Sequence, residues 1–141
     1  MRSIVRHIGR ESRGGVYDVN ALLVILGAAV GAPLRYLIDR AVQARHDTVF
    51  PWGTFTVNII GSVVLDLLVG SATVAAVPHS LQLLVGVGFC GALTTYSTFS
   101  YETLHLYEDG AHFHTVANVV FSVAAGLGAA FTGAAVAQAI L

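Results

Sequence analysis

The stretch from Leu93 to Tyr101 carries a hydroxyl on seven of its nine side chains, although it follows a long apolar run. Gly88 and Gly91 precede a pair of threonines, and glycine with β-branched threonine weakens a helix at this point. Inside a membrane, backbone groups freed by a break are tolerated only where they are buried in protein or line a cavity. Broken helices of this kind present carbonyls to a cation and helix N-termini to an anion. The stretch therefore indicates a helix break of the kind that contacts ions.

Polar residues recur at helical spacing on two other apolar segments. Asn58, Ser62 and Asp66 lie at i, i+4 and i+8, and Asn118 and Ser122 lie at i and i+4. Polar side chains inside a membrane either join helices by hydrogen bonds or mark a pathway. For any single residue the two interpretations weigh about equally. Two aligned stripes beside a hydroxyl-rich segment favour a polar pathway.

A third group of polar residues, His105, His112, His114, Glu108 and Asp109, lies around the last loop. Their spacing matches no tight ligand pattern, and a metal site needs a definite number and geometry of ligands. We expect these side chains to be solvated. The sequence has no phosphate-binding loop and no paired nucleophile and base, so neither an enzyme activity nor a nucleic-acid partner is expected.

The elements that must position these residues are membrane helices. The chain of 141 residues is 55% hydrophobic and 11% charged, with a mean hydropathy of +0.74, whereas a soluble domain carries about 25% charged residues. Apolar stretches cover residues 21–38, 55–77, 81–101 and 113–141. Each is near or above the roughly 18 to 20 residues that cross a bilayer as a helix. We predict an all-α membrane protein with one four-helix domain over residues 21–141, a break in the third helix, and a mobile tail over residues 1–20.

Charge and small residues bear on assembly. All seven basic residues are arginines. Four lie in the tail and three at the far end of the first helix, so the numbers of arginines expected on the two faces of the membrane differ by one. Such a small difference is a weak orientation signal, which supports the hypothesis that the chain inserts both ways up, with a slight preference for the tail inside. Small residues such as Gly27 and Gly31, or Ser122, Gly126 and Gly133, let helices approach closely. Because four helices enclose little interior, we expect oligomerisation to complete any protected path.

Three motifs resemble those of one family of small membrane channels, the Fluc or CrcB fluoride channels. GFCGALTTYSTFS at 88–100 is similar to their third-helix signature G-x-x-T-T-F-S-T-F. PWGTFTVNIIGS at 51–62 and GAAVGAPLRY at 27–36 are similar to their second-helix and first-helix motifs. The motifs follow the family's order, so the resemblance extends from the first helix to the fourth.

The resemblance implies an antiparallel dual-topology dimer in the cytoplasmic membrane, with two fluoride pores at the subunit interface and one central sodium ion. The pore residues that it implies are Asn58, Thr95, Tyr96, Thr98, Phe99 and Ser122. Backbone carbonyls of Gly91 and Thr94, doubled by those of a partner, would hold the sodium, and Arg35 would face an aqueous vestibule. Fluoride would leave the cell passively.

The chemistry of such a pore is consistent with these residue types. Fluoride is small and strongly hydrated, so a narrow pore must replace its water with donors such as the Asn58 amide and the hydroxyls of serine and threonine. Aromatic rings have a positive edge that can also meet an anion. Sodium, a hard cation, suits carbonyl oxygens.

Three residues depart from the family pattern. Tyr96 replaces a phenylalanine, Asn118 stands where tyrosine is common, and Asp66 stands where a small residue is usual. An ionised Asp66 would repel fluoride, so we expect it to be protonated by desolvation, paired with an arginine, or turned from the pore. Some members of the family pair as heterodimers, so homodimer and heterodimer are both open.

Two alternatives come from other classes of protein. A proton-coupled small multidrug exporter would need a membrane carboxylate, for which Asp66 could serve, but that family's key glutamate lies in the first helix, where this chain has none. A structural membrane subunit would use the polar residues only for packing. Proton-dependent export of cationic drugs would support the exporter, and no flux of any substrate would support the structural subunit.

Overall fold

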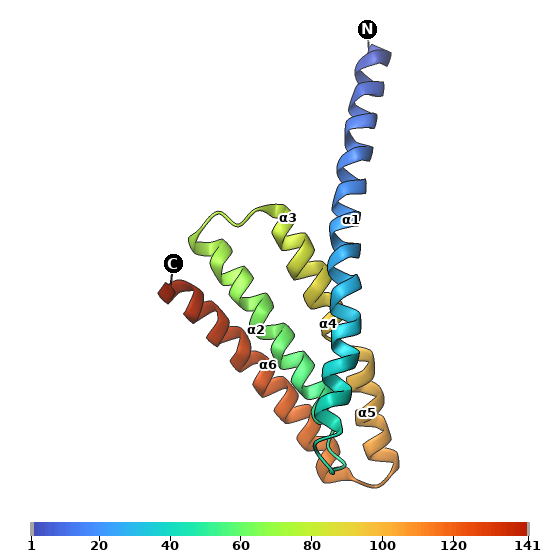
Figure 1. The fold of residues 1–141 in the computed structure, drawn as a ribbon, viewed down its shortest axis with the longest axis vertical. Helices are drawn as coiled ribbons and strands as arrows, with labels where there is room; N and C mark the ends of the chain where they lie inside the picture. Colours follow the sequence, from blue (N-terminus) through green and yellow to red (C-terminus); the bar gives the residue numbers. More distant parts are fainter. Residues whose placement is uncertain (1, 141) are drawn as a thin grey trace.

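Long helices build the whole fold (Figure 1). The computed structural model describes the backbone of residues 2–140 and the side chains of residues 15–140, and within that part there are helices and no strand. The elements are α1 (Arg2–Gln43), α2 (Trp52–Val74), α3 (His79–Leu81), η1 (Gln82–Cys90), α4 (Gly91–Leu93), α5 (Tyr96–Glu108) and α6 (His112–Ile140). Four segments are long and apolar enough to cross a membrane, Gly15–Gln43, Trp52–Val74, His79–Glu108 and His112–Ile140. The predicted all-α architecture with four spans is confirmed.

The first helix is longer at its N-terminal end than the sequence suggested. α1 begins at Arg2, so helix occupies most of the region in which we predicted a tail. The side chains of residues 1–14 lie outside the described residues, and the mobility of this segment stays a prediction.

The third span is broken between α4 and α5, as the glycines and threonines predicted. Thr94 has φ −78° and ψ 158°, and Thr95 has φ −148° and ψ 125°, so both are extended. The helix begins again at Tyr96, where Thr95 is the N-cap and its Oγ1 accepts a hydrogen bond from the Thr98 amide at 3.2 Å. Threonine suits this position because its hydroxyl satisfies an amide that has no helical partner.

Glycines set the closest helix contacts. A Cβ added to Gly27 of α1 would overlap the Leu84 carbonyl oxygen of η1, and one added to Gly88 would lie 2.6 Å from the Val24 carbonyl oxygen. α2 and α6, which run side by side in Figure 1, meet at Gly133, where an added Cβ would lie 2.7 Å from the Asp66 Cβ. Gly126 of α6 is different, because a Cβ there would meet nothing within 4 Å. The packing role is confirmed for Gly27 and Gly133, and Gly126 faces open space.

Candidate functional site

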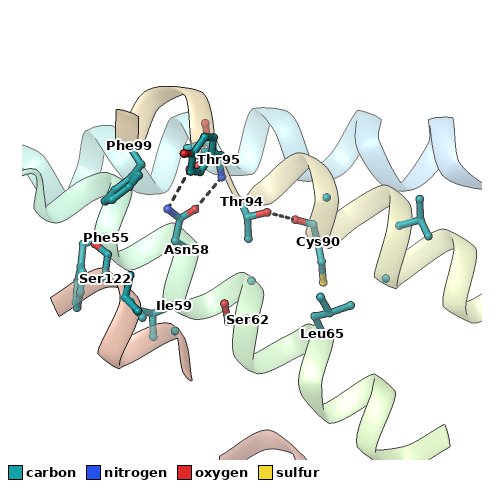
Figure 2. A pocket seen from close by; sticks show the side chains of 17 residues that line it. Phe55, Asn58, Ile59, Ser62, Leu65, Cys90, Thr94, Thr95, Phe99 and Ser122 are labelled. Atoms are coloured by element: carbon teal, nitrogen blue, oxygen red, sulfur yellow. Dashed lines mark hydrogen bonds between the residues drawn. The ribbon is translucent and has the colours of Figure 1, made fainter. Parts of the chain in front are cut away.

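An open groove with a volume of about 640 Å³ lies beside the break, between α2, the third span and α6 (Figure 2). The predicted site residues that line it are Asn58, Gly91, Thr94, Thr95, Tyr96, Phe99 and Ser122. Most of the remaining wall is apolar, including Ile59, Leu65 and Val87, and none of the side chains that the structure describes along it is charged. Two predicted residues, Arg35 and Thr98, are not part of the lining.

The side-chain amide of Asn58 holds the break from α2. Its Nδ2 donates to the Thr95 carbonyl oxygen at 3.1 Å, and the Thr95 amide donates to its Oδ1 at 2.8 Å (Figure 2). The amide therefore replaces two backbone partners that the broken helix lacks. Because the Thr95 amide can only donate, it also fixes which end of the Asn58 side chain carries the oxygen. The second hydrogen of Nδ2 has no partner among the described residues, and Asn58 lines the groove.

The threonine hydroxyls of the break mostly satisfy the chain itself. Thr94 Oγ1 donates to the Cys90 carbonyl oxygen at 3.0 Å, and Thr95 Oγ1 donates to Thr98 Oγ1 at 3.1 Å. Thr98 thus supports Thr95 from the first turn of α5, outside the groove wall. The unusual number of hydroxyls near the break has a local cause, since a break in a membrane leaves groups that no water can satisfy.

A further hydrogen bond, which the sequence analysis missed, links α2 to the third span within α5. Thr54 Oγ1, whose residue is 2% exposed, donates to Glu102 Oε1 at 2.9 Å. The other carboxyl oxygen, Oε2, is buried and has no hydrogen-bond partner among the side chains that the structure describes. Thr54 lies one turn before Asn58, so it extends the polar stripe, and an acidic residue within a span is unusual enough to mark. Those two signals could have identified the pair.

A third polar link joins α6 to α5. Asn118 is 1% exposed, and its Nδ2 donates to Thr103 Oγ1 at 2.9 Å. Thr103 Oγ1 in turn donates to the Phe99 carbonyl oxygen at 2.7 Å, while Ser122 Oγ donates to Asn118 Oδ1 at 3.4 Å. Asn118 was noted in the sequence as a departure, but its partner Thr103 was missed.

Two aromatic rings stand at the groove after the break. The ring centroids of Tyr96 and Phe99 are 6.1 Å apart with the planes tilted by 41°, and both residues line the groove. Tyr96 is 80% exposed. Its ring therefore projects from the single chain.

Asp66 and Arg35 are not part of the groove lining. Asn58 and Ser62 line it, but Asp66 does not, and its Cβ packs against Gly133 of α6. Of the three expectations for Asp66, this arrangement favours a side chain turned from the groove. Arg35 is half-buried on α1, and its role in a vestibule stays a prediction.

The backbone from Gly91, the first residue of α4, to Thr94, its C-cap, carries carbonyl oxygens beside the break. Gly91 is exposed, and a Cβ added to it would meet no heavy atom within 4 Å, so its backbone is open to an approaching group. In the described part of the chain no three histidine, cysteine or acidic side chains form a metal-binding group. The carbonyls at this helix end are a donor set that a hard monovalent cation accepts. The residues present therefore fit the sodium ion that the family resemblance implies.

Comparisons with known sequences give the same family as the sequence motifs. Residues 22–134 match the family described as CrcB-like protein, Camphor Resistance (CrcB). The chain is 63% identical over 122 residues to fluoride-specific ion channel FluC 1 of Streptomyces avermitilis, covering 86% of this chain and 98% of that one. It is 61% identical over 127 residues to FluC 1 of Frankia casuarinae, with 86% and 98% covered. It is 41% identical over 119 residues to FluC of Methanocaldococcus jannaschii, with 84% and 94% covered.

Proposed function

The chain belongs to the CrcB family of multi-pass membrane proteins, and we propose that it is a channel that lets fluoride cross the membrane passively. The observation that carries the proposal is its 63% identity to a protein named a fluoride-specific ion channel. The groove also supports the proposal, because the helix break, the Asn58 amide and the aromatic rings of Tyr96 and Phe99 lie together along it. Such a protein is a passive channel and catalyses no reaction.

The groove has the features that fluoride conduction requires. Asn58 can donate its second Nδ2 hydrogen to the ion, and its amide does not have to reorient because Thr95 already holds it. The ring of Phe99 can offer its positive edge. Among the described residues no charged side chain lines the groove, so hydrogen-bond donors and aromatic edges would contact the anion there without an ion pair that would hold it back.

We further propose that two copies of the chain close the groove in an antiparallel dimer. The groove is open on one side, and Tyr96, at 80% exposure, projects from the chain beside it. The nearly equal numbers of arginines on the two faces support insertion in both orientations. A homodimer is the simplest assembly, and a heterodimer with a related chain is the alternative that the experiment below distinguishes.

A sodium ion at the centre of this dimer is the third element of the proposal. The carbonyls of Gly91 and Thr94 from each copy would hold it at the two breaks. The ion would supply positive charge near both grooves and would link the two chains. The exposed backbone at Gly91 supports this position.

The test is to reconstitute the purified chain alone in liposomes and to measure anion efflux with ion-selective electrodes. Fluoride should leave the liposomes and chloride should not, without any imposed proton or sodium gradient. A requirement for a proton gradient would support the exporter instead. If this chain passes no fluoride alone but does so with a related chain from the same genome, the assembly is a heterodimer.

A further inference from the structure

We propose that Asn118 is a positioning residue that controls how strongly the Ser122 hydroxyl donates to fluoride, an inference that rests on the proposed function. Ser122 lines the groove, whereas Asn118 lies behind the wall, 1% exposed. The two are joined in a hydrogen-bonded relay of four residues, Ser122, Asn118, Thr103 and Phe99. Both ends of the relay, Ser122 and Phe99, line the groove.

The direction of every hydrogen bond in the relay is determined. The Phe99 carbonyl can only accept, so the single Thr103 hydroxyl hydrogen is directed to it at 2.7 Å. Thr103 Oγ1 must then accept from Asn118, which places Nδ2 toward Thr103, at 2.9 Å, and Oδ1 toward Ser122. Because Oδ1 can only accept, Ser122 has to be the donor.

This direction matters for the groove. In the absence of an ion, the Ser122 hydrogen points at Asn118 Oδ1 and the lone pairs of Ser122 are left toward the groove. An anion has no use for lone pairs, so the hydroxyl has to rotate before it can donate to fluoride. The Ser122–Asn118 distance of 3.4 Å is long for a hydroxyl donor, so this bond is the weakest of the relay.

Asn118 therefore competes with the ion for one hydrogen. When Ser122 turns to fluoride, Asn118 Oδ1 loses its partner, and a buried acceptor without a partner is unfavourable. Asn118 has no second orientation that relieves this, because Thr103 holds its amide in place. The relay weakens fluoride binding at Ser122 and so favours rapid passage over tight binding.

The test measures single-channel fluoride conductance in planar bilayers as a function of fluoride concentration. Asn118→Leu removes the competing acceptor at similar volume, so the half-saturating fluoride concentration should fall by about 2- to 10-fold, the equivalent of one neutral hydrogen bond. Thr103→Val removes the group that orients Asn118, which can then turn its Nδ2 to Ser122. The half-saturating fluoride concentration should again fall, but by less than in Asn118→Leu.

Two controls separate this role from packing. In a Ser122→Ala background both substitutions should leave the half-saturating concentration unchanged, because the hydrogen that they release is absent. Thr115→Val removes a threonine that also donates to the carbonyl one turn back, at 3.1 Å, but is outside the relay, and it should have no effect.

The outcomes distinguish the two proposals. If the wild-type chain, alone or with a related chain, carries no fluoride current, the proposed function is overturned and this inference with it. If it carries current and Asn118→Leu leaves half-saturation unchanged, or shifts it equally in the Ser122→Ala background, the relay is only a structural contact and this inference alone is overturned.

Discussion

The two halves of the third span are held in place by different kinds of contact. Before the break, η1 lies against α1 through glycines, so that the Gly88 backbone approaches Val24 and the Gly27 backbone approaches Leu84. After the break, α5 is held by side-chain hydrogen bonds, from Thr54 to Glu102 and from Asn118 to Thr103, with the Asn58 amide at the junction.

The difference follows from the kinds of contact that stabilise helix association in lipid. Apolar side chains gain little by leaving lipid for protein, so membrane helices associate through close packing or through hydrogen bonds. In η1 the side-chain amide of Gln82 donates to the Val77 carbonyl oxygen, and among the described residues no side-chain hydrogen bond joins η1 to α1, so the contact of this glycine half depends on shape. The α5 half contains the groove, and there polar groups that stabilise the fold also stand beside the ion path. Substitutions in the first half should therefore affect folding, and those in the second should affect conduction, stability or both.

The largest effect is expected in the glycine half. Gly27→Val would place side-chain carbons on the Leu84 carbonyl, which is backbone and cannot move aside without shifting η1. We expect no monodisperse protein after extraction in detergent, measured by size-exclusion chromatography. Gly128→Ala on α6 is the matched control, because a Cβ there meets nothing within 4 Å of this chain. A well-folded Gly27→Val protein would show that the glycine contact is not required.

The next largest effect is expected at the junction. Asn58→Asp keeps the oxygen that accepts from the Thr95 amide but loses the donor and adds a carboxylate to the groove. Two like charges about 4 Å apart repel by roughly 4 kcal/mol at an effective dielectric constant of about 20. Fluoride efflux from liposomes should fall by about 100-fold or more. Ser62→Ala, on the same groove wall, is the control and should reduce efflux far less.

Phe99→Ile tests whether the ring acts through its edge or only fills space. A volume-conserving apolar substitution costs under about 1.5 kcal/mol of stability, so the assembly should survive. Loss of an aromatic-edge contact of about 1 kcal/mol should lower fluoride efflux by about fivefold. Phe113→Ile, at an exposed ring outside the groove, should leave efflux unchanged. Wild-type efflux in Phe99→Ile would make this ring a packing residue, like those of the glycine half.

A smaller effect on stability is expected from Thr54→Val. The isosteric valine removes the one hydrogen bond to Glu102, whose other oxygen is already without a partner in the described structure. The free energy of unfolding should fall by about 1–3 kcal/mol, measured by denaturation in detergent micelles. Thr56→Val, two residues away and half-buried, is the control and should change stability less. Equal losses of unfolding free energy in both variants would show that the Thr54–Glu102 hydrogen bond does not help to hold α5 in place.

The smallest effect is expected at Asp66. Its side chain is not part of the groove lining, and its Cβ packs on Gly133. Asp66→Asn, which keeps the size and removes the charge, should leave both fluoride efflux and its independence of pH gradients unchanged. Abolished transport would instead give Asp66 an essential proton and return the exporter to consideration.

The spans, the break and the groove residues were largely predictable, and the hydrogen bonds between helices were not. Hydropathy and length reveal the four spans, and Gly91 with the two threonines reveals the break. The pairing of Thr54 with Glu102, 48 residues later, depends on how far α2 is displaced along α5, and a helical repeat carries no information on that register. Thr98, which we expected in the pore with Thr95, does not line the groove of the single chain, and its place in a pore stays a prediction.

The contact between Asn58 and Thr95 also constrains how the chain enters the membrane during its synthesis. The two residues are 37 positions apart, so α2 leaves the ribosome well before the break does. A third span alone in lipid would expose the Thr95 amide and carbonyl, and an unsatisfied group there costs about several kcal/mol. α2 must therefore already be in the bilayer, with Asn58 accessible, when the third span leaves the translocon, which makes the order of helix insertion a condition for forming the break.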